Sequence, residues 1–187
     1  MERMLLLLLL WPALLGNSYS DYLSAKRKID LIGNDQAPAG SKIVLTGTEL
    51  NAYVSHEVAA RVREGLREPR VQLGHGSASG YALVDFPKLR QASGKPMNWL
   101  LAKLLEGERP VRVAARIHSE RGTARVDVES VEISGMTIEG ATLDYLIQKF
   151  VLPYYPGAKV GEPFELKHGI ERLEIRPAAV QVIIGQR

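Results

Sequence analysis

The chain has 187 residues, no cysteine, and 24 Lys and Arg against 21 Asp and Glu, which gives a formal net charge of +3. This length suits a single domain whose hydrophobic core needs neither disulfides nor a structural metal. The basic excess is too small for a nucleic-acid-binding protein, and a surface of mixed charges accounts for it.

The N-terminus has the pattern of a secretory signal peptide. Arg3 precedes an apolar run from Leu5 to Leu15, and small polar residues follow up to Ser20. The run is shorter than the ~20 residues that a membrane-spanning helix needs, so a retained membrane anchor is the less favoured alternative. The sequence predicts a signal peptide over residues 1–20, cleavage after Ser20, and a mature domain over 21–187 in the periplasm or outside the cell.

Residues 46–66 carry the longest amphipathic pattern in the chain. Their apolar side chains recur at steps of three and four, which places on one helical stripe Leu50, Tyr53, Val54, Val58, Val62 and Leu66. Thr46 and Glu49 have the spacing of a capping box, in which each side chain bonds the backbone of the other. Pro69 is expected to end the segment. The pattern predicts a long helix whose apolar stripe packs against a sheet.

The flanking segments give weaker signals. Residues 21–32 fit a helix or a strand, 33–40 form a loop, and 42–45 are extended. The glycine-rich residues 74–80 are expected to interrupt strand pairing, so that a strand resumes over 81–86 and leads into an irregular connection. A second helix is predicted over 97–106, ended by Gly107.

Residues 110–134 predict a β-hairpin. Val111, Val113 and Ile117 alternate with polar residues on the first strand. A two-residue turn at positions 121–122 would pair Arg116 with Asp127 and Ile117 with Val126. On the return strand the apolar phase slips by one residue, which indicates a β-bulge near Glu129 or Ser130 and a bent strand.

The C-terminal part predicts a third helix over 143–152 and three short strands near 164–166, 170–176 and 179–184. With strands joined mainly by hairpins, the fold class is α+β with an antiparallel sheet.

The sequence predicts no catalytic residue, metal or cofactor. His56 and Glu57 begin like the zinc-protease signature, but Ala60 stands where the second histidine ligand is required. The central position of Gly76 to Gly80 is Ala78, so this segment is not a nucleophile elbow. The glycines at 74, 76 and 80 are spaced too widely for a dinucleotide-binding loop.

The remaining chemistry-bearing residues are scattered. His118 and His168 are expected on the surface. Aromatic residues that either fill the core or line a ligand entrance are Tyr53, Trp99, Phe150, Tyr154 and Tyr155.

The order of elements resembles the tubular (TULIP-like) group of lipid-binding proteins, in particular its small periplasmic members. The segments that carry the resemblance are "LTGTELNAYV" with the helix after it, "VESVEISG", and the final "IERLEIRPAAVQVII". The resemblance implies a strongly curved antiparallel sheet wrapped around a long amphipathic helix, with two further short helices. It also implies an apolar cleft between sheet and helix that accepts a lipid or another apolar ligand without catalysis.

The side chains expected to line this cleft come from both elements. They are Leu50, Tyr53, Val54, Val58 and Val62 from the helix, and Val111, Val113, Ala115, Ile117, Val126 and Val128 from the hairpin. A peripheral contact with the membrane would use Trp99 or the tyrosines at 154 and 155. Two alternatives remain open: an envelope scaffold or protein-interaction domain with a solid core and no ligand, and a hydrolase with a dispersed site.

Overall fold

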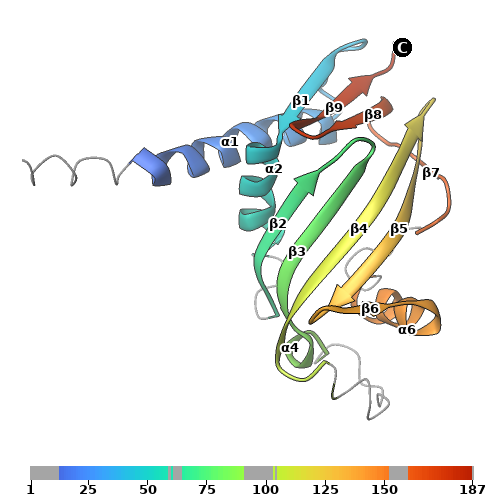
Figure 1. The fold of residues 1–187 in the computed structure, drawn as a ribbon. Coiled ribbons are helices and arrows are strands. Elements are labelled where there is room, and N and C mark those ends of the chain that lie inside the picture. The colour runs from blue at the N-terminus through green and yellow to red at the C-terminus, as the bar shows by residue number, and fades with distance from the viewer. Residues whose placement is uncertain are drawn as a thin grey trace, which may run out of the picture.

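The computed structural model describes residues 13–58, 60, 65–90, 103, 105–151 and 160–186. The chain forms an α+β fold with two antiparallel sheets (Figure 1). The smaller sheet has the strand order β1-β9-β8, and the larger has the order β2-β3-β4-β5-β6, with β7 paired to β5. The predicted fold class, α+β with antiparallel pairing, is therefore confirmed.

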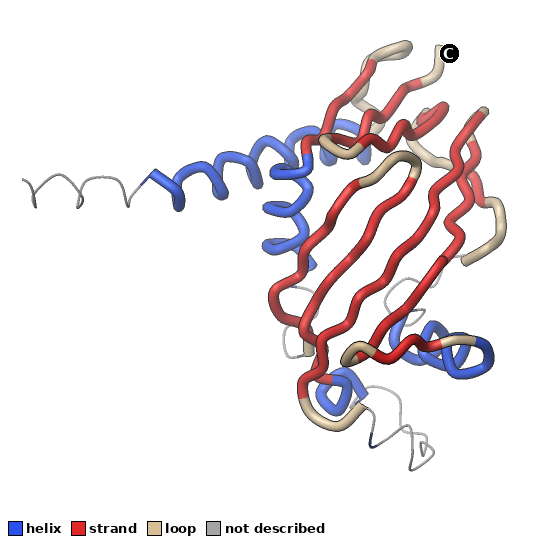
Figure 2. The backbone as a smooth tube through the Cα atoms, in the orientation of Figure 1, coloured by secondary structure: helices blue, strands red, loops and turns tan. Residues whose placement is uncertain are grey.

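The N-terminal part supplies one edge strand of the smaller sheet and the helices that cover it (Figure 2). Helix α1 (Ala13–Gly33) runs into β1 (Lys42–Thr46), which leads directly into α2 (Gly47–Tyr53) and the π-helical turn η1 (Val54–Val58). The ambiguous residues 21–32 are thus helical. No helix in the described residues is both long and apolar enough to cross a membrane.

The predicted capping box at the start of α2 is present. The backbone N–H of Glu49 donates to Thr46 Oγ1 at 3.2 Å, and Thr46 N donates to Glu49 Oε2 at 2.8 Å. The Glu49 carboxylate also accepts hydrogen bonds from Ser24 and Lys28 of α1, each at 2.6 Å. The cap therefore joins the first turn of α2 to α1.

The structure does not show one long α-helix over 46–66. Helical structure continues from α2 through η1 to Val58, and residue 60 is also helical, but Leu66 already begins strand β2 (Leu66–Leu73); residues 59 and 61–64 lie outside the described part. Pro69 does not end a helix. It lies in β2 where the register shifts between Arg67 and Arg70, and an edge strand with a bulge tolerates a residue that lacks a backbone N–H.

The larger sheet begins with the hairpin of β2 and β3 (Ser77–Asp85). Pairing continues through Ser79 and Gly80 into β4, so the expected interruption over 74–80 is confined to the turn. The five-residue helix α4 (Phe86–Arg90) follows where an irregular connection was expected. The predicted helix over 97–106 lies outside the described residues apart from positions 103, 105 and 106.

The predicted hairpin is confirmed as β4 (Glu108–Glu120) and β5 (Thr123–Ile133), with Arg116 opposite Asp127 and Ile117 opposite Val126. Arg121 and Gly122 both have positive φ, the conformation of a tight hairpin turn. Ala114 pairs with Ser130 and Ala115 with Val128, which leaves Glu129 as the extra residue of the predicted bulge.

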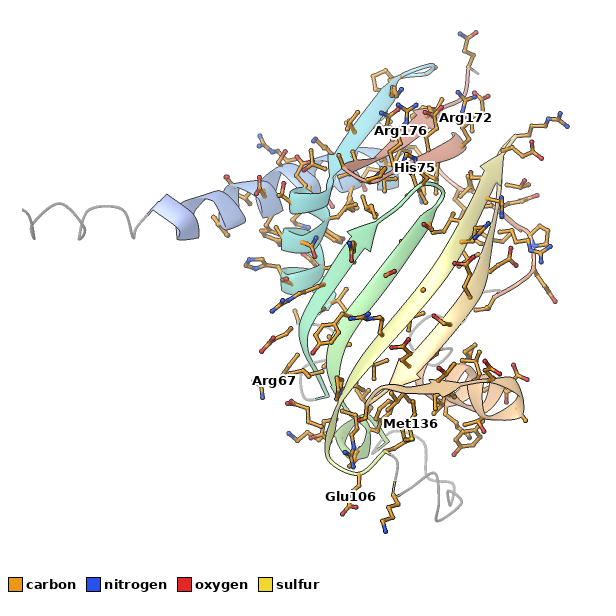
Figure 3. All side chains as sticks on the ribbon, in the orientation of Figure 1. Arg67, His75, Glu106, Met136, Arg172 and Arg176 are labelled. Carbon is orange, nitrogen blue, oxygen red and sulfur yellow. The ribbon has the colours of Figure 1, made fainter. Side chains whose placement is uncertain are left out.

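The C-terminal elements agree closely with the sequence. After β6 (Met136–Ile138), which was not predicted, α6 (Gly140–Leu146) continues into the π-helical turn η2 (Ile147–Val151). Strands β7 (Phe164–Glu165), β8 (Ile170–Arg176) and β9 (Ala179–Ile184) correspond to the three predicted strands. Strand β8 meets the turns of the larger sheet, because Gly76 N donates to Ile175 O at 3.0 Å; Figure 3 shows His75, Arg172 and Arg176 together at this end.

Two separate hydrophobic clusters hold the fold together. The sheet cluster joins β3, β5 and β6 to α4 and α6, and its buried members are Val84, Phe86, Leu105, Val131, Ile133, Ile138 and Leu146. The terminal cluster joins α1 to the smaller sheet, and its buried members are Ala25, Ile32, Leu45, Val182 and Ile184. The described residues show no strongly curved sheet wrapped around a helix, since α2 lies along the β2 edge of the larger sheet instead (Figure 1).

Candidate functional site

An apolar pocket of about 310 Å³ lies between the larger sheet and the helices α4 and α6, and it is partly open to solvent. Nearly all of its exposed lining is apolar. The sheet contributes Leu66, Val84, Val111, Val113, Val128, Val131 and Ile133, and the other elements contribute Phe86, Leu89, Leu143, Leu146, Ile147 and Val160. This volume is about twice the ~150 Å³ of an engineered apolar cavity that takes up benzene.

The β-bulge explains how the hairpin presents one continuous apolar wall. Val113 pairs with Val131 and Val111 with Ile133 across the two strands, so all four share one face of the sheet. Without the extra residue at Glu129, Val128 would point to the opposite face, because successive side chains alternate. The extra residue that causes the phase slip in the sequence therefore places Val128 in the pocket wall.

The helical side of the pocket is formed by α4, α6 and η2, which the sequence analysis did not assign to a ligand cleft. The apolar stripe of α6 faces the sheet through Leu143 and Leu146. The sequence predicted a helix over 143–152 but did not assign it a packing partner. Leu66 and Phe86 were missed because they were assigned to the end of a helix and to the end of a strand.

One charged side chain lies beside the pocket. Arg109 is opposite Val84 in the β3–β4 register, and cross-strand neighbours share a face of the sheet. The Nε atom of Arg109 is buried and has no hydrogen-bond partner among the described residues. A buried donor without a partner costs about 1–3 kcal/mol, so an acceptor that reached Arg109 from the pocket would recover this energy.

The structure brings only part of the predicted cleft together. Val111, Val113 and Val128 line the pocket under α4 and α6. Ala115, Ile117 and Val126 are half-buried further along the hairpin, away from the pocket lining. Val54 and Val58 are half-buried in η1, and Val62 lies outside the described residues.

The predicted helical wall of the cleft is the main correction. Leu50 and Tyr53 pack in the terminal cluster against α1 and the smaller sheet, not against the β4–β5 hairpin. The physical reason is α1, which the sequence left ambiguous. This helix covers the apolar stripe of α2, while α4 and α6 cover the apolar face of the hairpin.

Metal-ligating side chains do not gather at one place in the part of the chain that the structure describes. Among the described residues, no three His, Asp or Glu side chains stand close enough together to hold a metal ion. The ring of His56 stacks on Tyr22, with ring centroids 4.4 Å apart. His118 and His168 are exposed, as predicted. The side chains of Trp99, Phe150, Tyr154 and Tyr155 lie outside the described part.

Comparison of the chain with protein-family models, with curated proteins and with solved structures finds no match. The assignment of a site therefore rests on the geometry of the pocket and on the chemistry of its lining.

Proposed function

We propose that this protein is a non-enzymatic binding module that takes up a lipid acyl chain or another apolar ligand in the pocket between the larger sheet and α6. The observation that carries the proposal is a space of about 310 Å³ with an almost wholly apolar lining. Binding sites for small molecules are concave, mostly apolar, and begin at about 300 Å³. A solid core would leave few voids larger than a water molecule.

The signal-peptide pattern supports a periplasmic or secreted location for this activity. Membership of the tubular lipid-binding group is part of the same proposal, and it is supported by the order of elements in the sequence. In that group the ligand would lie between a curved sheet and a long helix. Here the proposed site uses the hairpin wall predicted for such a cleft, with α4 and α6 in place of the long helix.

The size of the pocket sets the expected affinity. Burying a ten-carbon chain at ~0.8 kcal/mol per CH₂ gives roughly 8 kcal/mol. Association costs about 4 kcal/mol or more, which leaves at most about 4 kcal/mol and a dissociation constant near the millimolar range. A polar contact for the head group would strengthen binding, and Arg109 stands beside the pocket to provide one.

The test is competition for an apolar fluorescent probe by decanoate and decanol, with one variant that fills the pocket. Val113→Phe places a larger side chain in the pocket wall, so we expect it to abolish probe uptake in a folded protein. The matched control is Val44→Phe, the same change at a strand valine that is 37% exposed and outside the pocket.

Equal uptake by the two folded variants would contradict the proposal. A wild-type protein that binds neither the probe nor decanoate would favour the scaffold alternative, in which the pocket has no ligand of this kind.

A further inference from the structure

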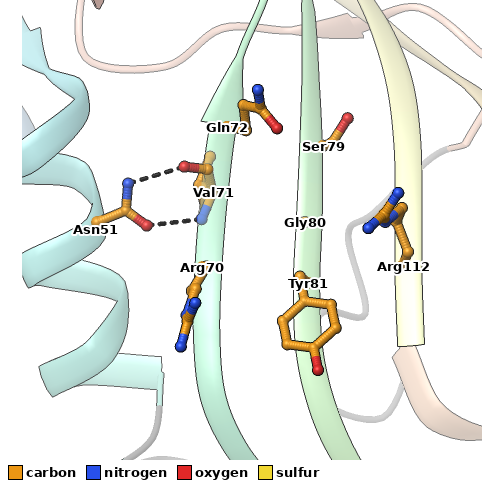
Figure 4. A pocket seen from close by; sticks show the side chains of 8 residues that line it. All are labelled: Asn51, Arg70, Val71, Gln72, Ser79, Gly80, Tyr81 and Arg112. Atoms are coloured by element: carbon orange, nitrogen blue, oxygen red, sulfur yellow. Dashed lines mark hydrogen bonds between the residues drawn. The ribbon is translucent and has the colours of Figure 1, made fainter. Parts of the chain in front are cut away.

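The face of the larger sheet opposite the apolar pocket carries a polar hollow of about 590 Å³, partly open to solvent (Figure 4). The hollow lies over β2, β3 and β4 beside α2. The side chains around it are Asn51, Arg70, Gln72, Ser79, Tyr81 and Arg112.

Two arginines flank a tyrosine in one row across this face. Arg70 pairs in register with Tyr81, and Tyr81 pairs with Arg112. Neighbouring strands are ~4.8 Å apart, so the two arginine backbones stand about 10 Å apart with the tyrosine between them. Arginine side chains are long enough for both guanidinium groups to reach one small group held above Tyr81.

The adjacent row explains why the surface is hollow there. Ser79 pairs with Ala114, and Ala114 pairs with Ser130. Because these side chains are small, the row next to Arg70, Tyr81 and Arg112 leaves space above the sheet. Asn51 borders the hollow, but we do not expect it to bind the ligand, because its side-chain amide is already hydrogen-bonded to the backbone of Val71 (Figure 4).

Arg112 differs from the other arginines on this face of the hairpin. Arg116 forms an ion pair with Glu129 at 2.6 Å, and Arg125 forms one with Asp127 at 2.7 Å. Arg112 makes no ion pair or hydrogen bond with any described residue, although Glu132 is opposite it in register. Figure 4 shows its side chain leaning from β4 toward β3, over the hollow.

Arg70 is also available for a ligand. Its ion pair with Glu68 is 3.3 Å long, and both side chains are largely exposed. Exposed pairs of this kind contribute little to stability, so Arg70 can exchange Glu68 for another anion at small cost. The hollow therefore offers two guanidinium groups that have no strong carboxylate partner within the described ranges of the chain.

We propose that this hollow binds the phosphate or carboxylate group of a small ligand. The guanidinium groups of Arg112 and Arg70 donate paired hydrogen bonds to the anion. The Tyr81 hydroxyl and the side chains of Ser79 and Gln72 contact the rest of the ligand. This site lies on the other side of the sheet from the apolar pocket, so it stands or falls independently of the proposed function.

The test is a titration of the ¹⁵N-labelled protein with inorganic phosphate, followed by NMR of the backbone amides and the arginine Nε–H groups. We expect saturable shifts at Arg112, Arg70, Tyr81 and Ser79. Arg112→Gln should weaken binding about 10- to 100-fold, which corresponds to the loss of a charge-assisted hydrogen-bonded pair. Arg125→Gln is the matched control, because it removes an exposed arginine from the same sheet face outside the hollow.

A second experiment separates a soluble ligand from a lipid head group. The wild type, Arg112→Gln and Arg125→Gln proteins are sedimented with vesicles of phosphatidylglycerol and of phosphatidylcholine. Binding to phosphatidylglycerol that Arg112→Gln alone removes would assign the site to a lipid phosphate. Phosphate binding in solution without this vesicle binding would assign it to a soluble anion.

Two results would overturn the proposal. One is the absence of saturable shifts with phosphate together with the absence of Arg112-dependent vesicle binding. The other is an equal loss in Arg112→Gln and Arg125→Gln, which would mean that only the general positive charge of the face attracts anions.

Discussion

The side-chain amide of Asn51 in α2 pairs with both backbone groups of Val71 in β2. Val71 N donates to Asn51 Oδ1 at 2.7 Å, and Asn51 Nδ2 donates to Val71 O at 2.8 Å. The second amide hydrogen reaches Gly47 O, also at 2.8 Å. Strand β2 is the edge of the larger sheet, and one side chain here takes the place of a neighbouring strand.

Asn51→Leu should therefore destabilise the protein by about 1–3 kcal/mol, because it leaves the Val71 N–H and C=O without partners in a half-buried position. Urea unfolding measures the loss, and amide exchange at Val71 should become faster. Asn51→Asp is the control of nearly equal size: it can still accept from Val71 N but cannot donate to Val71 O, so we expect an intermediate loss. Unchanged stability of Asn51→Leu would mean that α2 does not protect this edge.

The carboxylate of Glu49 makes the stability of the protein dependent on pH. Burial raises the pKa of Glu49, but hydrogen bonds from Lys28, Ser24 and Thr46 together with the charge of Lys28 outweigh it and lower the pKa to about 2. Because the pKa in the folded state lies below the ordinary value of 4.5, the ionised carboxylate stabilises the fold above that value. This stability is lost as the pH falls from about 4.5 toward 2.

The difference in pKa corresponds to roughly 3 kcal/mol at neutral pH. Unfolding by urea at a series of pH values should show this loss for the wild type below pH ~4.5. Glu49→Gln should be less stable at neutral pH and should lack most of the dependence below that pH. Parallel pH curves for the two proteins would contradict the assignment of the effect to Glu49.

Replacing either of two glycines by alanine should change the stability of the protein, in opposite directions at the two positions. A Cβ on Gly80 in β3 would meet no atom within 4 Å, so Gly80→Ala should stabilise the protein by about 0.4–1 kcal/mol through the lower entropy of the unfolded chain. Gly122 has φ +76° in the β4–β5 turn, where an alanine costs about 1–2 kcal/mol. Thermal unfolding of the two variants checks both signs.

Arg109 should determine which head group the apolar pocket prefers. If the buried Nε–H of Arg109 donates a hydrogen bond to a ligand carboxylate, the wild type should bind decanoate about tenfold or more tightly than decanol, since hydrogen bonds to charged groups contribute about 1.5–3 kcal/mol. Arg109→Met keeps the apolar stem and should bind both ligands equally. An unchanged preference in Arg109→Met would place the head group elsewhere.

Short-range patterns in the sequence predicted local structure well. The β4–β5 register and the bulge at Glu129 follow from alternation, charge pairing and a two-residue turn, all of which involve residues close in the chain. The capping box was predicted for the same reason, because Thr46 and Glu49 are three residues apart.

Partners distant in the chain were not predictable in this way. The stripe of Leu50 and Tyr53 showed that a helical face is buried, but not that α1 would cover it. A proline at position 69 is compatible both with the end of a helix and with a bulge in an edge strand. The polar hollow depends on the register of three strands. This register was not predicted, because the glycines between 74 and 80 were expected to interrupt the pairing of β2 with β3.

The central claim is that the pocket between the larger sheet and α6 holds an apolar ligand. The most direct test is methyl NMR of the protein with labelled valine and leucine during a titration with decanoate. We predict saturable shifts confined to pocket residues such as Val111, Val113, Val128 and Leu146, with Val182 and Leu45 of the terminal cluster unchanged. Shifts that are absent, or that appear equally in both clusters, would contradict the account.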